Sequence, residues 1–291
     1  MTKFVSPAAR RAALEAAAGY LRCPVCGGPM RLGDTQLSCG NGHGFDIARQ
    51  GYVNLTAGRA NPGTADTAAM IAGREEFLGR GHYRPLAESL ASLASSCEPF
   101  GDGLVIDLAG GTGYYLAAAL DALPGRHGLS VDLSTAALQR ATRAHPRAAA
   151  AGADVWQHLP LASASAALVL SVFGPRNAAE IDRILTADGV LIVAAPGDAH
   201  LRELRGPLGL IGVDQRKRQR LADAFGHYAK AGSQVLSYRL SLGHADLAAL
   251  TAMGPSAHHI APSALADRIK ALPSPAAVTV DLRISAYRRP G

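Results

Sequence analysis

The chain has 291 residues, of which 48% are hydrophobic and 18% are charged, and its formal net charge is +6. This length is enough to bury a full core and to carry a second small module, and no apolar run approaches the ~20 residues that cross a bilayer, which excludes a helical membrane span. The first twenty residues interrupt their alanines with Arg10, Arg11 and Glu15, unlike a signal peptide, so we expect a cytoplasmic globular protein.

A cysteine and histidine cluster follows a short alanine-rich helix, which is expected over residues 6–20. Its spacing is C-x2-C-x12-C-x3-H, formed by Cys23, Cys26, Cys39 and His43. Three thiolates and one imidazole are a ligand set that Zn2+ takes in closed tetrahedral sites, which leave no open position for chemistry. We therefore predict one structural Zn2+. A redox Cys-x-x-Cys is the alternative, although no thioredoxin-like strand precedes it, and Cys97 lies apart from the cluster.

Short extended segments are expected around the metal, at residues 30–32, 36–38, 44–46 and 51–55. The following residues, 56–64, contain Gly58, Pro62 and Gly63 and are typical of a linker. We therefore divide the chain into residues 1–60, an N-terminal extension with a zinc-binding module, and residues 61–291, a larger domain.

Two helices are expected at the start of the larger domain, because apolar side chains recur at helical spacing over residues 65–79 and again over 84–93. Gly81, His82 and Tyr83 separate them. Judged by spacing alone, His82 and Tyr83 are packing residues.

A glycine-rich turn, Asp107–Gly113, is the strongest sign of a ligand in this domain. It lies between an apolar strand expected over 104–108 and a helix expected over 114–120. Glycines let the backbone approach a ligand closely, and the free N–H groups at the helix start point at it. The order D-x-A-x-G-x-G resembles the first motif of S-adenosylmethionine-dependent methyltransferases, with Ala109 in place of a glycine.

A second carboxylate supports a nucleoside-type cofactor at this turn. Asp132 ends the next expected strand, where doubly wound folds place a ribose-binding carboxylate. Asp107 lies beside the turn itself, so both aspartates are candidate cofactor contacts. The alternative is a tight turn between strand and helix that binds nothing.

The remaining elements alternate between strand and helix. Strands are expected over 127–131, near 153–156, and over 166–172, 190–195, 236–242 and 278–287. Helices are expected from Ser134 and over 177–185, 245–253 and 264–272. The alternation predicts a parallel sheet with helices on both faces, and with residues 104–108 it provides seven strands.

Ligands of such sheets bind outside the carboxyl ends of the strands. The predicted crevice therefore consists of residues 107–113, Asp132, residues 156–158, residues 173–175, and residues 196–198 with His200. The densest basic run, residues 216–220, is usually a solvated helix face, and it favours contact with a polyanion only if another feature points to nucleic acid.

Several motifs carry a resemblance to a known family. They are the zinc pattern, Phe45-Asp46-Ile-Ala-Arg-Gln-Gly51-Tyr52-Val53-Asn54-Leu55, Asp66 with Met70 and Arg74, Gly81-His82-Tyr83-x-Pro85-Leu86, Phe173-Gly-Pro175, Ala195-Pro196-Gly197 and His200-Leu201. From about Leu21 to the C-terminus the chain resembles the 23S ribosomal RNA (guanine-N1)-methyltransferases called RlmA. Within that family it is most similar to the actinomycete branch that gives tylosin-type macrolide resistance.

The resemblance implies an α/β fold, that of a class I S-adenosylmethionine-dependent methyltransferase. Such a fold is Rossmann-like, with a seven-stranded, mostly parallel sheet whose last strand pair is partly antiparallel, here joined to a small N-terminal zinc-binding module. It also implies that S-adenosylmethionine contacts Tyr83, Gly111, Thr112 and His200, which replaces the packing role that spacing alone gave Tyr83. Asp107 and Asp132 complete the expected cofactor contacts.

The activity that the resemblance implies is methyl transfer from S-adenosylmethionine to N1 of a guanine in a 23S rRNA hairpin loop, with macrolide resistance as a consequence. The expected partners are 23S rRNA and a second copy of the chain in a homodimer, without a membrane. A zinc module that reads RNA shape would bring to the phosphates Arg22, Arg31, Arg49 and Arg59. Phe173 and Trp156 are candidates to stack on the target base, and no general base is identified.

Two other functions remain open at this point. One is a methyltransferase of small molecules that carries a zinc knuckle. The other is a zinc-dependent RNA-binding protein with a degenerate cofactor site, which Ala109 suggests.

Overall fold

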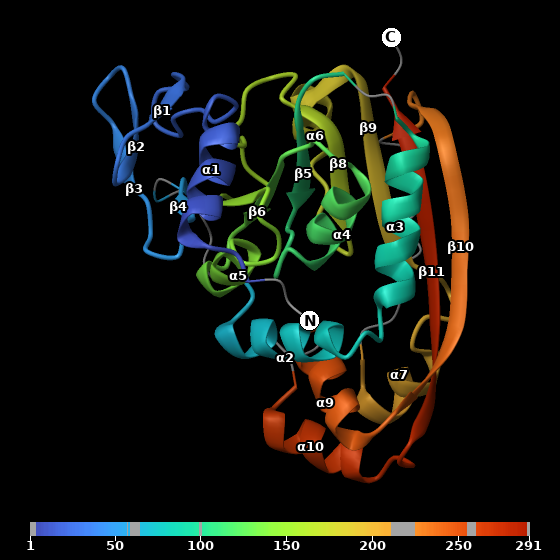
Figure 1. Cartoon of the computed structure of the whole chain (residues 1–291). Helices are drawn as coiled ribbons and strands as arrows, with labels where there is room; N and C mark the ends of the chain where they lie inside the picture. The colour runs from blue at the N-terminus through green and yellow to red at the C-terminus, as the bar shows by residue number, and fades with distance from the viewer. Residues whose placement is uncertain are drawn as a thin grey trace.

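The computed structural model describes residues 4–56, 58, 65–98, 101–210, 225–254 and 260–289. Its centre is a sheet of eight strands in the order β10-β11-β9-β8-β5-β6-β7-β4 (Figure 1). The strands are, in chain order, β4 (Val53–Asn54), β5 (Leu104–Leu108), β6 (Gly128–Asp132), β7 (Ala148–Gly152), β8 (Ala166–Val172), β9 (Leu185–Pro196), β10 (Ala229–Leu242) and β11 (Ala276–Arg288).

The sheet is parallel from β4 to β9 and antiparallel at its other end. β5 pairs in parallel with β6 and β8, whereas β11 runs antiparallel to both β9 and β10. This confirms the mostly parallel sheet with an antiparallel last pair. Six of the seven expected strands are present, the third strand lies at other residues than expected, and the two-residue β4 joins the edge as an eighth by pairing with β7.

The predicted position of the third strand is wrong. It was expected near residues 153–156, but β7 is Ala148–Gly152, and residues 153–156 form the loop that follows. Four alanines and a glycine are poor strand formers by propensity. They fit here because β7 is buried throughout, so small side chains let other elements pack closely against it.

Helices cover both faces of the sheet, as the alternation predicted. α3 (Arg84–Ser96) and α4 (Tyr114–Ala122) pack on the face that holds Val105, whereas α1 (Pro7–Ala18) and α6 (Ala178–Ile184) pack on the face that holds Ile106. Neighbouring residues of β5 thus enter opposite cores, because side chains alternate along a strand.

Further helices lie at the ends of the strands. α5 (Thr135–Ala141) follows β6, and α2 (Ala68–Gly79) packs on α9 (His244–Ala252), with α10 (Pro262–Lys270) beside it (Figure 1). α7 (Arg202–Leu208) was not expected, because Gly206 and Pro207 argue against a helix. None of the described helices is long and apolar enough to cross a membrane.

The N-terminal part contains a small antiparallel sheet of its own, β1 (Met30–Leu32), β2 (Gln36–Cys39) and β3 (Gly44–Asp46). Its buried side chains do not form a separate core. Leu21 and Leu37 belong to the same hydrophobic cluster as Leu104 and Ile106 of the central sheet. The division of the chain at residue 60 stays a prediction, and most of the expected linker, residues 57 and 59–64, lies outside the described residues.

Candidate functional site

Four side chains converge in the N-terminal part. The ligand atoms of Cys23, Cys26, Cys39 and His43 all lie within 4.8 Å of one another. Two tight loops bring them together, because Gly27 N–H bonds to the carbonyl of Cys23 and Gly42 N–H bonds to the carbonyl of Cys39. Gly27 and Gly42 both have positive φ, of 73° and 82°, which only glycine adopts without strain.

The spacing of these atoms fits a tetrahedral zinc ion. Zn–S bonds of about 2.3 Å and Zn–N bonds of about 2.0 Å imply S···S separations of about 3.8 Å and S···N separations of about 3.5 Å. Cys26 Sγ lies 3.7 Å from Cys39 Sγ, and His43 Nδ1 lies 3.6 Å from Cys23 Sγ and 3.4 Å from Cys39 Sγ. The set of donors and their distances therefore suit one closed structural Zn2+.

The glycine turn follows β5 as predicted, and its backbone is left-handed at three positions. Ala109, Gly111 and Gly113 have φ of 55°, 56° and 76°. Ala109 is therefore the one place in this turn where a side chain bears the strain that a glycine avoids. Its methyl group faces Gly174, where an added Cβ would lie 3.1 Å away.

The two predicted aspartates lie beside this turn in different environments. Both oxygens of Asp132 accept backbone hydrogen bonds, from Gly111 N at 2.8 Å and from Ser134 N at 2.8 Å. Asp107 is 1% exposed, and its Oδ2 has no hydrogen-bond partner within the described part of the chain. Burial, together with the charge of Asp132, raises the pKa of Asp107 to about 8, so the free protein holds this carboxyl largely protonated at pH 7.

An aromatic cluster joins three elements that are far apart in the sequence. The ring of Phe173, after β8, lies 6.0 Å from that of Tyr83 and 6.1 Å from that of His200, between centroids. The Tyr83 hydroxyl lies 3.4 Å from His200 Nε2. Phe173 is 40% exposed and has a φ of 58°, a strained conformation of the kind that gathers at functional sites.

The imidazole of His200 is neutral in this cluster. Burial lowers its pKa to about 4, and the nearby charge of Arg205 acts in the same direction. Its Nδ1 accepts the N–H of Asp281 at 3.3 Å, which assigns the proton to Nε2 as a donor toward Tyr83. An uncharged ring there does not repel a cationic ligand.

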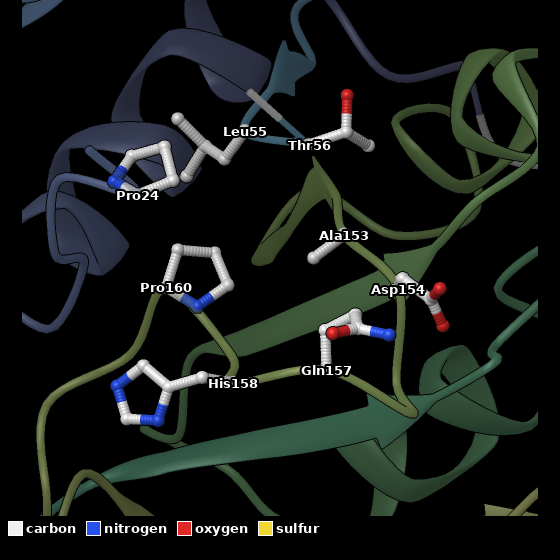
Figure 2. Close-up of a pocket in the computed structure, with 8 residues that line it drawn as sticks. All are labelled: Pro24, Leu55, Thr56, Ala153, Asp154, Gln157, His158 and Pro160. Atoms are coloured by element: carbon white, nitrogen blue, oxygen red, sulfur yellow. The ribbon is translucent and has the colours of Figure 1, made fainter. Parts of the chain in front are cut away.

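A cavity lies where the N-terminal part meets the loop after β7. Figure 2 shows Pro24, Leu55 and Thr56 on one side, and the residues of the loop on the other: Ala153, Asp154, Gln157, His158 and Pro160. Gln157 and His158 were predicted for the crevice. Trp156 is 59% exposed and is not among the residues that line this cavity.

Two polar residues near these features were missed by sequence reasoning. Asp154 lines the cavity, and an acidic residue just after a parallel strand is the signal that could have indicated it, had β7 been placed correctly. Arg74 of α2 reaches the glycine turn, and its Nη1 would lie 2.8 Å from a Cβ at Gly111. No local pattern could have indicated this contact, because it joins separate elements.

The arginines predicted to meet RNA differ in their surroundings. Arg31 and Arg49 are exposed, whereas Arg22 donates hydrogen bonds to the carbonyls of Gly19 and Leu21. Arg59 and the basic run at residues 216–220 lie outside the described residues. Thr112 lies in the turn and is half-buried.

Comparisons with known proteins agree with both parts of the chain. Residues 21–57 match the family model described as "RlmA, N-terminal", a zinc ribbon. A protein of Micromonospora griseorubida assigned to the 23S rRNA (guanine-N(1)-)-methyltransferases is 48% identical over 287 residues, which cover 92% of this chain and 97% of that protein. The 23S rRNA (guanine(748)-N(1))-methyltransferase of Streptomyces fradiae is 46% identical over 271 residues, covering 92% and 96%.

Among solved structures, the YcgJ protein from Bacillus subtilis is similar, with 16% sequence identity and a TM-score of 0.49. The similarity covers 70% of this chain and 98% of that one.

Proposed function

We propose a function from one premise: the chain belongs to the family of 23S rRNA (guanine-N1)-methyltransferases. Its fold is that of a class I S-adenosylmethionine-dependent methyltransferase with an N-terminal zinc ribbon. The enzyme transfers a methyl group from S-adenosylmethionine to N1 of a guanine in 23S rRNA, and it contains one structural Zn2+. The observation that carries this conclusion is the Cys3His cluster in the same chain as the cofactor turn.

We propose that the cofactor lies across the glycine turn, with Asp107, Gly111 and Thr112 beside it, and that Tyr83 and His200 close the pocket. The orphaned buried Oδ2 of Asp107 supports this placement, because an unpaired carboxylate oxygen is costly unless a ligand satisfies it. Bound there, S-adenosylmethionine supplies an electrophilic methyl group. Asp132 is proposed to contact the cofactor directly. It also acts indirectly, because it accepts a hydrogen bond from the N–H of Gly111 and so fixes the turn.

The target base is proposed to stack on Phe173. N1 lies on the Watson–Crick edge of guanine, so the base must be unpaired or flipped out before it can react. Phe173 is partly exposed and contacts both Tyr83 and His200, which would place a stacked base beside the cofactor. Because much of such a reaction is positioning, a rigid ring held in a strained conformation suits the task.

The zinc ribbon is proposed to position the RNA. Arg31 and Arg49 are exposed there and could pair with phosphates. We further propose that the target lies in a hairpin loop and corresponds to the guanine at position 748 named for the Streptomyces fradiae relative. Methylation at that position would lead to tylosin-type macrolide resistance.

Two further proposals follow from an rRNA substrate. The reaction takes place where ribosomes are made, so the protein is cytoplasmic. Two copies of the chain act as a homodimer, because a pair of zinc ribbons could span a large RNA. Light scattering of the purified protein at micromolar concentration checks the second proposal, which a monomeric mass contradicts.

The function is tested with unmethylated 23S rRNA, S-adenosylmethionine and purified enzyme. Primer extension should stop at one new guanine, because a methyl group on N1 blocks base pairing. Activity should also fall steeply as salt rises, since phosphate contacts compete with counterions. A small-molecule methyltransferase would leave the RNA unmodified, and a degenerate cofactor site would bind no S-adenosylmethionine in calorimetry.

A further inference from the structure

An acidic and a basic side chain flank consecutive glycines of the cofactor turn. A Cβ at Gly110 would lie 3.0 Å from Asp107 Cγ, and a Cβ at Gly111 would lie 2.8 Å from Arg74 Nη1. The carboxyl group comes from β5 below the turn, and the guanidinium comes from α2. A side chain at either glycine would therefore collide with one of these two groups.

The guanidinium of Arg74 is held from one side. Its Nη2 lies 2.7 Å from Asp66 Oδ2 and donates to the carbonyl of Met253 at 3.2 Å. Neither of these contacts uses Nη1, which is the nitrogen beside Gly111. The side chain is 24% exposed, so its position is set by neighbours rather than by free rotation in solvent.

The helix that carries Arg74 is itself fixed closely. Gly73 packs against α9, where an added Cβ would lie 3.0 Å from Ala252 Cβ and 3.1 Å from the carbonyl of Ala249. At the start of α2, the Ser134 hydroxyl donates to the carbonyl of Asp66 at 2.7 Å. Ser134 also bonds Asp132, so one network links α2, the ribose-side carboxylate and the turn.

We propose that Arg74 binds the carboxylate of the methionine moiety of S-adenosylmethionine, while Asp107 faces the ammonium group of the same moiety. This inference rests on the proposed function and deepens it. An α-amino acid carries both charges on one carbon, which matches a cation and an anion that flank two adjacent glycines. The orphaned Oδ2 of Asp107 is the independent sign that a donor is missing there.

A lone anion, such as a phosphate of the RNA, is a poorer match for this site. The carboxyl groups of Asp107 and Asp132 both lie beside the turn, and an anion that brings no cation of its own would disfavour the ionised form of either group. A zwitterion satisfies Arg74 and Asp107 together. The carboxylate would also gain a charge-assisted hydrogen bond from Nη1, the nitrogen that the contacts with Asp66 and Met253 do not use.

The test is calorimetry of the full-length protein with S-adenosylmethionine and with decarboxylated S-adenosylmethionine, which lacks only the carboxylate. The wild type should bind the first about 10- to 100-fold more tightly, as expected for charge-assisted hydrogen bonds. Arg74→Met should lower the affinity for S-adenosylmethionine alone, so that the two ligands bind equally to within about 3-fold. Arg143→Met is the matched control, because Arg143 is exposed on the surface and bonds only locally, to the carbonyl of Gln139.

The outcomes separate this inference from the function on which it rests. If Arg74→Met keeps the wild-type preference, whether or not both ligands bind more weakly, the role of Arg74 is overturned and the methyltransferase function is left intact. If Arg74→Met fails to fold, Arg74→Lys decides: it keeps the charge but loses the Nη1 donor, so the preference should fall to an intermediate value, and wild-type preference contradicts the inference. A wild-type protein that binds neither ligand would contradict both.

Discussion

The metal cluster and the cofactor pocket are built in opposite ways. The four metal ligands lie within 21 residues of one another in the sequence, and two glycine loops bring them together. The proposed cofactor pocket instead draws Arg74, Tyr83, Asp107, Phe173 and His200 from separate elements. Local spacing therefore determines the first site, whereas the topology of the sheet determines the second.

The two regions are nevertheless joined by one hydrophobic core. Leu21 and Leu37 pack in the same cluster as Leu104 and Ile106, and β4 extends the central sheet. The two halves of the molecule have different chemistry, but they need not be independent in stability. The predictions below test how far each region acts alone, from the largest expected effect to the smallest.

Loss of the metal should have the largest effect. Cys39→Ser or chelation with EDTA should remove an ordering free energy on the order of 10 kcal/mol from the N-terminal part. Because Leu21 and Leu37 share the central core, the melting temperature of the whole chain should fall as well. Differential scanning calorimetry measures this. Cys97→Ser, a buried cysteine outside the cluster, is the control, and a central domain that melts unchanged without zinc would show that the regions are independent.

Removal of the Phe173 ring should affect RNA more than cofactor. One base–aromatic stack contributes about 1–3 kcal/mol, so Phe173→Ala should lower kcat/KM for rRNA by roughly 10- to 100-fold. Phe173→Tyr should restore most of it, and Trp156→Ala compares the other candidate. If Trp156→Ala instead shows this loss of kcat/KM and Phe173→Ala does not, the target base stacks at the loop after β7.

The protonation of Asp107 should respond to the cofactor. Burial raises its pKa to about 8, and a bound ammonium group favours the ionised form. Binding of S-adenosylmethionine at pH 7 should therefore release up to one proton, measured by calorimetry in buffers of different ionisation enthalpy. Asp107→Asn should release none, and proton uptake by the wild type would contradict the assignment.

Asp107 should also make the free energy of unfolding of the free protein depend on pH. Its folded pKa lies above the unfolded value of about 3.9. The folded state therefore holds a proton that the unfolded chain has lost, and the free energy of unfolding should fall as pH rises between about 4 and 8. In denaturant unfolding, Asp107→Asn should remove that part of the slope.

The smallest effect is expected at Ala109. Its left-handed backbone costs about 1 kcal/mol, and a glycine there relieves this strain but loses more entropy on folding. Ala109→Gly should raise the free energy of unfolding by less than ~1 kcal/mol and leave the affinity for S-adenosylmethionine nearly unchanged. Gly111→Ala, at a similar φ but against Arg74, should instead destabilise. A destabilised Ala109→Gly protein would contradict this account of the turn.

Sequence reasoning succeeded where the determinants are local. It predicted the zinc ligands, the turn after β5 and six of the seven strands expected in the central sheet. It misplaced β7, because the burial that makes a run of alanines into a strand comes from the neighbouring strands and helices. Spacing alone treated Tyr83 as a packing residue, and its role as a cofactor contact, which only the family resemblance implied, stays a prediction.

Arg74 illustrates what no local pattern provides. The resemblance included it in a motif, but its position over the turn depends on the contact between α2 and α9. Ala109 shows the converse: the sequence revealed the missing glycine, and the structure shows that its backbone is left-handed and that its methyl group faces Gly174.

The central claim is that one chain uses a zinc ribbon and a cofactor pocket to methylate N1 of a guanine in 23S rRNA. The most direct test maps N1-methylguanosine by mass spectrometry in 23S rRNA from cells with and without this protein. We expect a single guanine to carry the methyl group only when the protein is present, and to lose it when Cys39→Ser replaces the wild type. An rRNA with identical methylation in both cells would contradict the account.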